Sequence, residues 1–206
     1  MSENGLSGII LGIIPFVRKT TLDDIATEFE EPGIFENSRR EIESENSAIV
    51  SNLRYLEQWS VGHEEEVFAE RLALIVYFAI KREYQDRDPQ WRMPFARDLM
   101  VWERIVKKLI GSDLTTNQES LKMVKKQPDS GGAAYEDRIL LSSPEAALRS
   151  LIPDGQHELH TYIDLQTNFA RGKFGNNLAA MMACLVYLSL KEAEKDAAIG
   201  RFEMSY

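Results

Sequence analysis

The stretch EEEVFAERLALIVYFAIKREY, residues 64–84, decides the fold, because from Leu72 to Ile80 its only polar side-chain group is the hydroxyl of Tyr77. A segment of this length, with several alanines and charged ends, favours a helix over a strand. About 20 residues at ~1.5 Å each would make this helix roughly 30 Å long. An apolar surface on every side has to be covered by other parts of the chain. We therefore predict a buried central helix over residues 64–84.

A second run of the same kind, LAAMMACLVYLSL, occupies residues 178–190 and is followed by a charged segment. It predicts a helix over about 177–195. Two helices without a polar face are expected to pack against each other, while amphipathic helices close the bundle around them. The sequence therefore predicts an all-α fold, a compact bundle of about seven or eight helices around these two.

Further helices are expected on both sides of the central one. A capping box at Thr21 and Asp24 predicts a short helix that ends near Glu30. One apolar stripe predicts a single amphipathic helix from Ser38 to Trp59. The remaining predicted helices span residues 95–110, 116–126, 143–152 and 154–170.

Changes of composition divide the chain into four segments. We expect an apolar N-terminal arm over residues 1–18, a helical core lobe over 19–127, a loop at 128–132 and a C-terminal helical lobe over 133–206. The loop, PDSGG, is the strongest break in the sequence. The two lobes are expected to pack as one structural domain.

Composition excludes some classes of protein and favours others. A net charge of -9 over 206 residues argues against a surface that attracts nucleic acid or acidic lipid everywhere. The single cysteine, Cys184, allows no internal disulfide and no cysteine-based zinc site, which fits a cytoplasmic or otherwise intracellular protein. The apolar segment at residues 6–17 is too short to span a bilayer, so no membrane span is expected.

Histidines and acids recur at positions i, i+3 and i+7 in two of the expected helices. They are His157, His160 and Asp164 in one helix, and His63, Glu66 and Glu70 at the start of the central one. If the two stripes faced each other, they could hold a divalent metal in the bundle, as in a metal-dependent hydrolase or oxidase. The HExxH order of zinc proteases is absent, and solvated helix faces explain the same pattern.

Basic residues suggest a second kind of site, for nucleic acid or another anion. The candidates are Arg82, Arg87, Arg92 and Arg97, which are interleaved with aromatic residues, and Arg171 and Lys173 in a glycine-containing stretch expected to be a loop. Arginines neutralise phosphates and aromatic rings stack on bases, as in a structural nucleoprotein or coat-like protein. For residues 171–175, an ordinary glycine turn with an asparagine cap is the favoured alternative.

Charge is also distributed unevenly along the chain. Residues 23–70 contain fourteen acidic side chains against three basic ones, whereas residues 81–126 contain eleven basic against seven acidic ones. The two regions either neutralise each other within one molecule or meet an opposite charge outside it, on a partner or, head to tail, on the next copy of the chain.

An apolar arm at the N-terminus supplies candidate contact residues for a partner. They are Leu6, Ile9, Ile10, Ile13, Ile14 and Phe16. The alternative is that the arm packs on the chain's own core. No residue pattern indicates a nucleophile, because Cys184 lies among apolar residues and no GxSxG elbow occurs. We therefore expect a non-enzymatic interaction or structural subunit without a cofactor, which binds itself or another protein.

Overall fold

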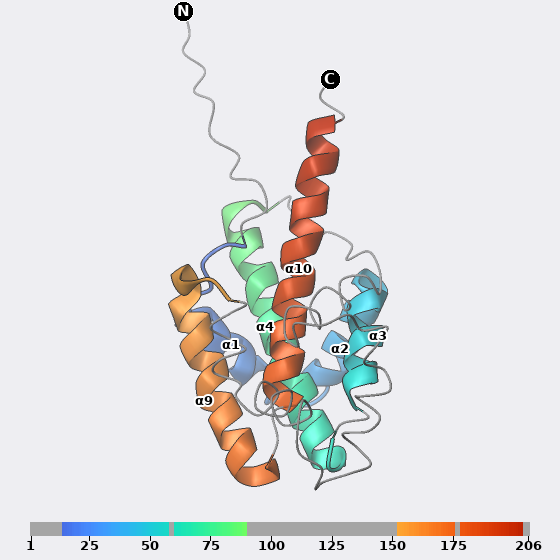
Figure 1. Ribbon diagram of the computed structural model, residues 1–206, viewed down its shortest axis with the longest axis vertical. Helices are drawn as coiled ribbons and strands as arrows, with labels where there is room; N and C mark the ends of the chain where they lie inside the picture. The colour runs from blue at the N-terminus through green and yellow to red at the C-terminus, as the bar shows by residue number, and fades with distance from the viewer. Residues whose placement is uncertain (1–13, 58–59, 90–151, 176–177, 204–206) are drawn as a thin grey trace, which may run out of the picture.

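The computed structural model describes residues 14–57, 60–89, 152–175 and 178–203, and all regular structure in these ranges is helical (Figure 1). The predicted all-α class is confirmed. The elements are α1 (Lys19–Glu28), α2 (Ile34–Glu45), α3 (Ser47–Glu57), α4 (His63–Arg87), the 3-10 turn η1 (Asp154–Gln156), α9 (His157–Phe174) and α10 (Leu178–Glu203). These ranges hold six α-helices, against the seven or eight predicted for the whole chain. The helices predicted at 95–110, 116–126 and, apart from Ile152, 143–152 lie outside them.

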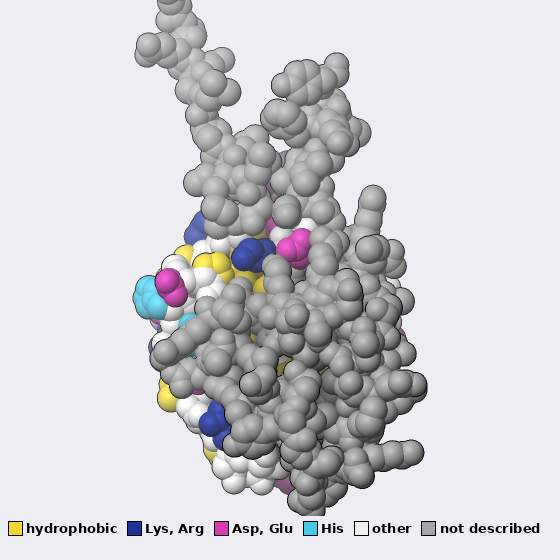
Figure 2. Space-filling model, viewed as in Figure 1, with side chains coloured by type: hydrophobic (Ala, Val, Ile, Leu, Met, Phe, Trp, Pro, Cys, Tyr) yellow, Lys and Arg dark blue, Asp and Glu magenta, His cyan; other side chains and the backbone are white. Residues whose placement is uncertain are grey.

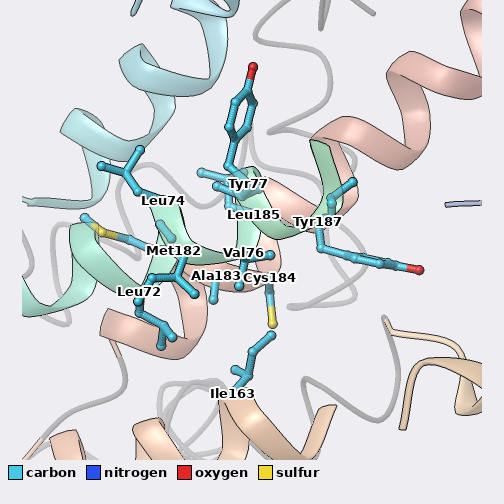
Figure 3. Packing of buried hydrophobic residues seen from close by; sticks show 14 of the residues in the cluster. Leu72, Leu74, Val76, Tyr77, Ile163, Met182, Ala183, Cys184, Leu185 and Tyr187 are labelled. Carbon is cyan, nitrogen blue, oxygen red and sulfur yellow. The ribbon is translucent and has the colours of Figure 1, made fainter. Parts of the chain in front are cut away.

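The two helices predicted to be apolar on every side, α4 and α10, form the centre of the bundle. They pack along each other, with α1 and α9 on one side of the pair and α2 and α3 on the other (Figure 1). Every residue from Met182 to Leu190 is buried, and Leu72 to Tyr77 are buried in α4. Figure 3 shows these side chains interleaved, with Cys184 of α10 pointing toward Ile163 of α9.

One hydrophobic core joins residues from the beginning and the end of the chain. It contains Ile14 and Leu22 as well as Ile163 and Ala193, so both predicted lobes contribute to it. The predicted lobe boundary at 128–132 lies outside the described residues and stays a prediction. Among the helices that the structure describes, none combines the length and hydropathy needed to cross a bilayer.

The single helix predicted over residues 38–59 is wrong, because the chain leaves helical geometry at Asn46. Its φ and ψ are -146° and 62°, and this break separates α2 from α3. Asn46 is fully buried and its side-chain Nδ2 donates a hydrogen bond to the Tyr77 hydroxyl of α4 at 3.0 Å. A buried amide needs such a partner, and the apolar period of the sequence does not reveal it.

The predicted N-terminal cap of the first helix is also wrong. Helix α1 begins at Lys19, after Arg18, and no side-chain capping bond is present there. Thr21 lies inside the helix, buried, and donates its hydroxyl to Glu83 of α4 at 2.6 Å. The threonine therefore satisfies a buried carboxylate of another helix rather than a backbone amide of its own.

Residues 171–173, which we expected in a loop, form the last turn of α9. The helix ends at Gly175, whose φ of 78° is left-handed and whose amide donates to the carbonyl of Arg171 at 2.9 Å. Glycine is the usual residue at this position after a helix. The helix therefore continues to Phe174, beyond its predicted end at residue 170.

Candidate functional site

The predicted metal-binding residues of α9 lie near its start and differ in exposure. His157 is exposed, and its ring lies 5.1 Å from the ring of Phe16. His160 and Asp164 are half-buried, and the Nε2 atom of His160 is buried without a hydrogen-bond partner among the residues that the structure describes. These three side chains share one helix, as predicted. In the described part of the chain, no other helix brings a further metal-binding residue to them.

The second predicted metal stripe lies at the other end of the bundle. Lys173, at the end of α9, pairs with Glu64, at the start of α4, so the two helices run antiparallel. His157 therefore lies beside the C-terminal end of α4, whereas His63 lies at its N-terminal end. A helix of 25 residues is about 37 Å long. The structure does not bring the two stripes together.

The acids of that second stripe have other partners. Glu66 accepts a hydrogen bond from the Ser60 hydroxyl at 2.7 Å, and His63 lies 3.4 Å from the same carboxylate. Glu70 pairs with Arg39 of α2 at 2.7 Å. Burial raises the pKa of Glu70, and Arg39 opposes this shift. No three histidine, cysteine or acidic residues converge in a metal-binding arrangement within the described ranges.

The predicted anion-binding residues are spread over the molecule. Arg82 binds both carboxylate oxygens of Glu28 in α1, at 2.9 and 2.8 Å. Arg87 is exposed at the end of α4, whereas Arg171 and Lys173 lie at the far end of the bundle. Arg92 and Arg97 lie outside the described residues. The described members therefore do not form one groove.

Part of the uneven charge along the sequence is neutralised within the chain. Lys81 of α4 binds Glu41 and Glu45 of α2, each at 2.6 Å, and Arg71 binds Glu30 at 2.7 Å. Burial alone would lower the pKa of Lys81, but the hydrogen bonds to the two glutamates raise it. Basic residues of α4 thus pair with the acidic N-terminal helices, which was one of the two alternatives.

The end of the predicted apolar arm belongs to the chain's own core. Ile14 and Val17 are 3% and 0% exposed, and Phe16 is half-buried against His157. Gln156 holds this segment by hydrogen bonds to its backbone. Ile14 is therefore a core residue rather than an open contact. The other predicted contact residues of the arm, Leu6, Ile9, Ile10 and Ile13, lie outside the described residues.

Two shallow cavities lie between α2 and its neighbours. One of about 200 Å³, between α2, α3 and α4, is lined by arginines and glutamates, among which Arg39 pairs with Glu70 and Arg54 with Glu43. The other, about 320 Å³, lies between α1, α2 and α4 over Phe78. Its basic rim residues, from α4, are held by the ion pairs to Glu28, Glu41 and Glu45. These charged groups are engaged with one another rather than aimed at a substrate.

A surface that the sequence analysis missed runs along the outside of α9. We call it the outer stripe, and its members are all exposed: Thr161, Leu165, Asn168, Phe169 and Gly172. Two of these are large and apolar, Leu165 at 60% and Phe169 at 58% exposed. The Phe169 ring lies 5.6 Å from that of Phe68 in α4, so the apolar surface continues onto the neighbouring helix.

The outer stripe could have been predicted from the helical period of the apolar residues in α9. The buried residues of α9 follow one helical face, Leu159, Tyr162, Ile163, Thr167 and Ala170. Leu165 and Phe169 are spaced one turn apart and lie out of phase with that set. Two large apolar side chains on the polar face of an amphipathic helix are the signal that indicates a second contact surface.

Comparisons of the chain with protein-family models, with curated proteins and with solved structures found no match. The case for a function therefore depends on the residues of this chain alone.

Proposed function

We propose that this chain is a non-enzymatic helical subunit that binds another protein chain, and that the outer stripe of α9 is its contact surface. The observation that supports this most is the exposure of Leu165 and Phe169, side by side on one helix. Large apolar side chains gathered in one patch on a folded surface are typical of protein contact sites. An aromatic side chain at the centre of a patch with polar neighbours is a common anchor of such interfaces.

Burial of these two side chains in a contact would favour association with a partner. Removing a leucine or phenylalanine side chain from water contributes about 1.5–3 kcal/mol, so the pair contributes on the order of 3–6 kcal/mol before the costs of association. Thr161 and Asn168 beside them provide polar groups at the rim. The contact needs no rearrangement of the core, because both side chains already point outward.

Other features fit a subunit that binds rather than catalyses. The charged groups that line the two cavities are largely held in ion pairs, and the thiol of Cys184 is buried in the core. The metal-dependent and nucleic-acid-binding functions remain predictions from sequence, and no observation on the described residues favours either. The arm at residues 6–13 remains a predicted second contact element.

A photo-crosslinking amino acid at position 169 tests the proposed surface in cells that express the full chain. The matched control carries the same group at Ser51, which is exposed on α3 across the bundle (Figure 1). We expect a protein adduct at position 169 and none at position 51. The purified adduct partner should then bind the unmodified chain, and Leu165→Ser with Phe169→Ser should weaken that binding at least tenfold. Equal crosslinking at the two positions would count against the surface.

A further inference from the structure

We infer that the partner at the outer stripe is a second copy of this chain, joined by antiparallel pairing of two α9 helices about a two-fold axis. This inference rests on the proposed function and identifies the partner of the same surface. In a two-fold contact the same patch is used on both subunits, so it must be complementary to itself. The outer stripe meets this requirement in the spacing of its apolar residues, and the charged residues of α9 that flank it meet it in their order along the helix.

The apolar pair has the spacing that an antiparallel contact needs. When two copies of α9 pair antiparallel with the axis at the level of Thr167, Leu165 of each copy lies opposite Phe169 of the other. Each leucine then covers an aromatic ring, and the four side chains form one apolar centre. The ring contact between Phe169 and Phe68 supports this arrangement, because it restrains the phenylalanine ring within the patch.

Charge along α9 favours the antiparallel arrangement over the parallel one. Glu158 and Asp164 lie in the N-terminal half of the helix, and Arg171 and Lys173 lie in its last turn. In the same register, Asp164 of one copy lies beside residues 170–171 of the other. A parallel pair would place like charges beside each other, which is unfavourable. The two helix dipoles also oppose each other in the antiparallel pair.

On the edge of the molecule where α9 lies, the space-filling view shows histidine side chains with an acidic one beside them near the start of the helix (Figure 2). Gly172 lies within the outer stripe, and a Cβ atom added there would meet no described atom within 4 Å outside its own stretch of helix. In the antiparallel register this open position lies close to Thr161 of the second copy, so two small side chains let the helices approach closely.

The interface centred on this patch is small. Contacts below the standard size are weak, so we expect a dimer with a dissociation constant on the order of 10–100 μM. Light scattering at chain concentrations on both sides of this range should show the mass rising toward that of two chains. Leu165→Ser with Phe169→Ser should keep the chain monomeric at the highest concentration.

Disulfide trapping tests the register directly. In the antiparallel pair, position 165 of one copy lies opposite position 169 of the other, whereas like positions are displaced by about 6 Å along the axis. A disulfide needs Cα atoms within about 7 Å. A mixture of Leu165→Cys and Phe169→Cys chains should therefore form at least tenfold more crosslinked dimer under mild oxidation than either variant alone. Cys184 is 2% exposed and does not compete.

The crosslinking experiment has a control variant, and specific results would contradict the inference. Ser51→Cys, on α3, reports the crosslinking that results from random collisions. Crosslinking of Leu165→Cys with itself above the level of the mixture would show parallel pairing and overturn the inference. A concentration-independent monomer without crosslinks overturns the second copy as partner. In that case, a photo-crosslinked adduct between position 169 and a different protein would still support the proposed function. The absence of any adduct at position 169 would contradict both the proposed function and the second copy as partner.

Discussion

The side-chain oxygen of Gln156 accepts a hydrogen bond from the backbone amide of Val17 at 3.1 Å, and these residues are 139 positions apart in the chain. The Nε2 group of the same side chain donates to the carbonyls of Ile14 and Pro15, at 3.1 and 2.8 Å. All three bonds are buried. One amide side chain thus satisfies three backbone groups of the segment that precedes α1 and fixes that segment against the turn before α9.

Replacement of this amide should destabilise the fold. Gln156→Leu leaves three buried backbone groups without a partner, and each such loss costs about 1–3 kcal/mol. We expect the free energy of unfolding to fall by about 3–5 kcal/mol in total, measured by urea denaturation. Gln85→Leu is the matched control, because Gln85 is exposed on α4, and it should change the free energy by less than about 0.5 kcal/mol. An equal effect of the two substitutions would refute the role given to Gln156.

Glu83 should make the free energy of unfolding depend on pH. Its side chain is 4% exposed; burial alone would raise its pKa, but hydrogen bonds from Arg18 and Thr21 outweigh burial and lower the pKa below 4.5. Because the folded-state pKa is lowered, its contribution is fully present above pH 4.5 and is lost as the pH falls through the folded-state value. We expect Glu83→Gln to cost about 2–3 kcal/mol at pH 7 and progressively less in acid.

The matched control for this prediction is the other acid that Arg18 binds. Asp86 pairs with Arg18 at 2.7 Å but is 55% exposed, so Asp86→Asn should cost less than about 1 kcal/mol at any pH. The quantity to measure is the difference in unfolding free energy between wild type and each variant from pH 3 to 7. A constant difference for Glu83→Gln would show that its carboxylate does not titrate with folding.

Tyr77 joins α4 to the break between α2 and α3. Its hydroxyl accepts from Asn46 Nδ2 and donates to Glu45, each at 3.0 Å, and burial raises the pKa of the tyrosine, so the hydroxyl keeps its proton. Tyr77→Phe leaves the buried amide of Asn46 without this acceptor and should cost about 1–3 kcal/mol in thermal or urea unfolding. The same substitution at Tyr162, a buried tyrosine of α9, should lower the free energy of unfolding by less. The reverse order would contradict the bridging role of Tyr77.

Cys184 should report global unfolding through its reactivity. Burial raises the pKa of its thiol to about 12, so the reactive thiolate is scarce and shielded in the folded chain. We expect a thiol reagent at pH 8 to modify Cys184 only at the rate at which the chain unfolds, and immediately in denaturant. Cys184→Ser should destabilise the protein more than Cys184→Ala, because it buries a hydroxyl among apolar side chains. Rapid modification of the folded chain would contradict this placement.

The centre of the fold was predictable because both runs, Leu72 to Ile80 and Leu178 to Leu190, are apolar on every side and can only be buried between other helices. The break at Asn46 was not predictable, since Ile42 and Ile49 keep a helical period across it. What separates α2 from α3 is the bond from Asn46 to a tyrosine of another helix. Local pattern determines which residues form helices, whereas such tertiary bonds determine where the helices stop.

For the candidate site, the sequence correctly placed His157, His160 and Asp164 on one helix. It could not show that α9 runs antiparallel to α4, and this direction separates those residues from His63. The positions of Leu165 and Phe169 in the helical period were enough to predict the outer stripe. It was missed because the spacing of His157, His160 and Asp164 was used for this helix and the spacing of its apolar residues was not.

The bond between Gln156 and Val17 also has a consequence for protein synthesis. At ~5–20 residues per second, a ribosome needs roughly 7–28 s to extend the nascent chain from Val17 to Gln156, 139 positions later. Helix α10, which covers α4, follows later still. From its own synthesis until α10 is made, α4 lacks its main partner among the described helices, and the nascent chain presents the apolar surface of α4 to cellular chaperones. The order of helices along the chain therefore makes the folding of this core a late event, which waits until α10 has been synthesised.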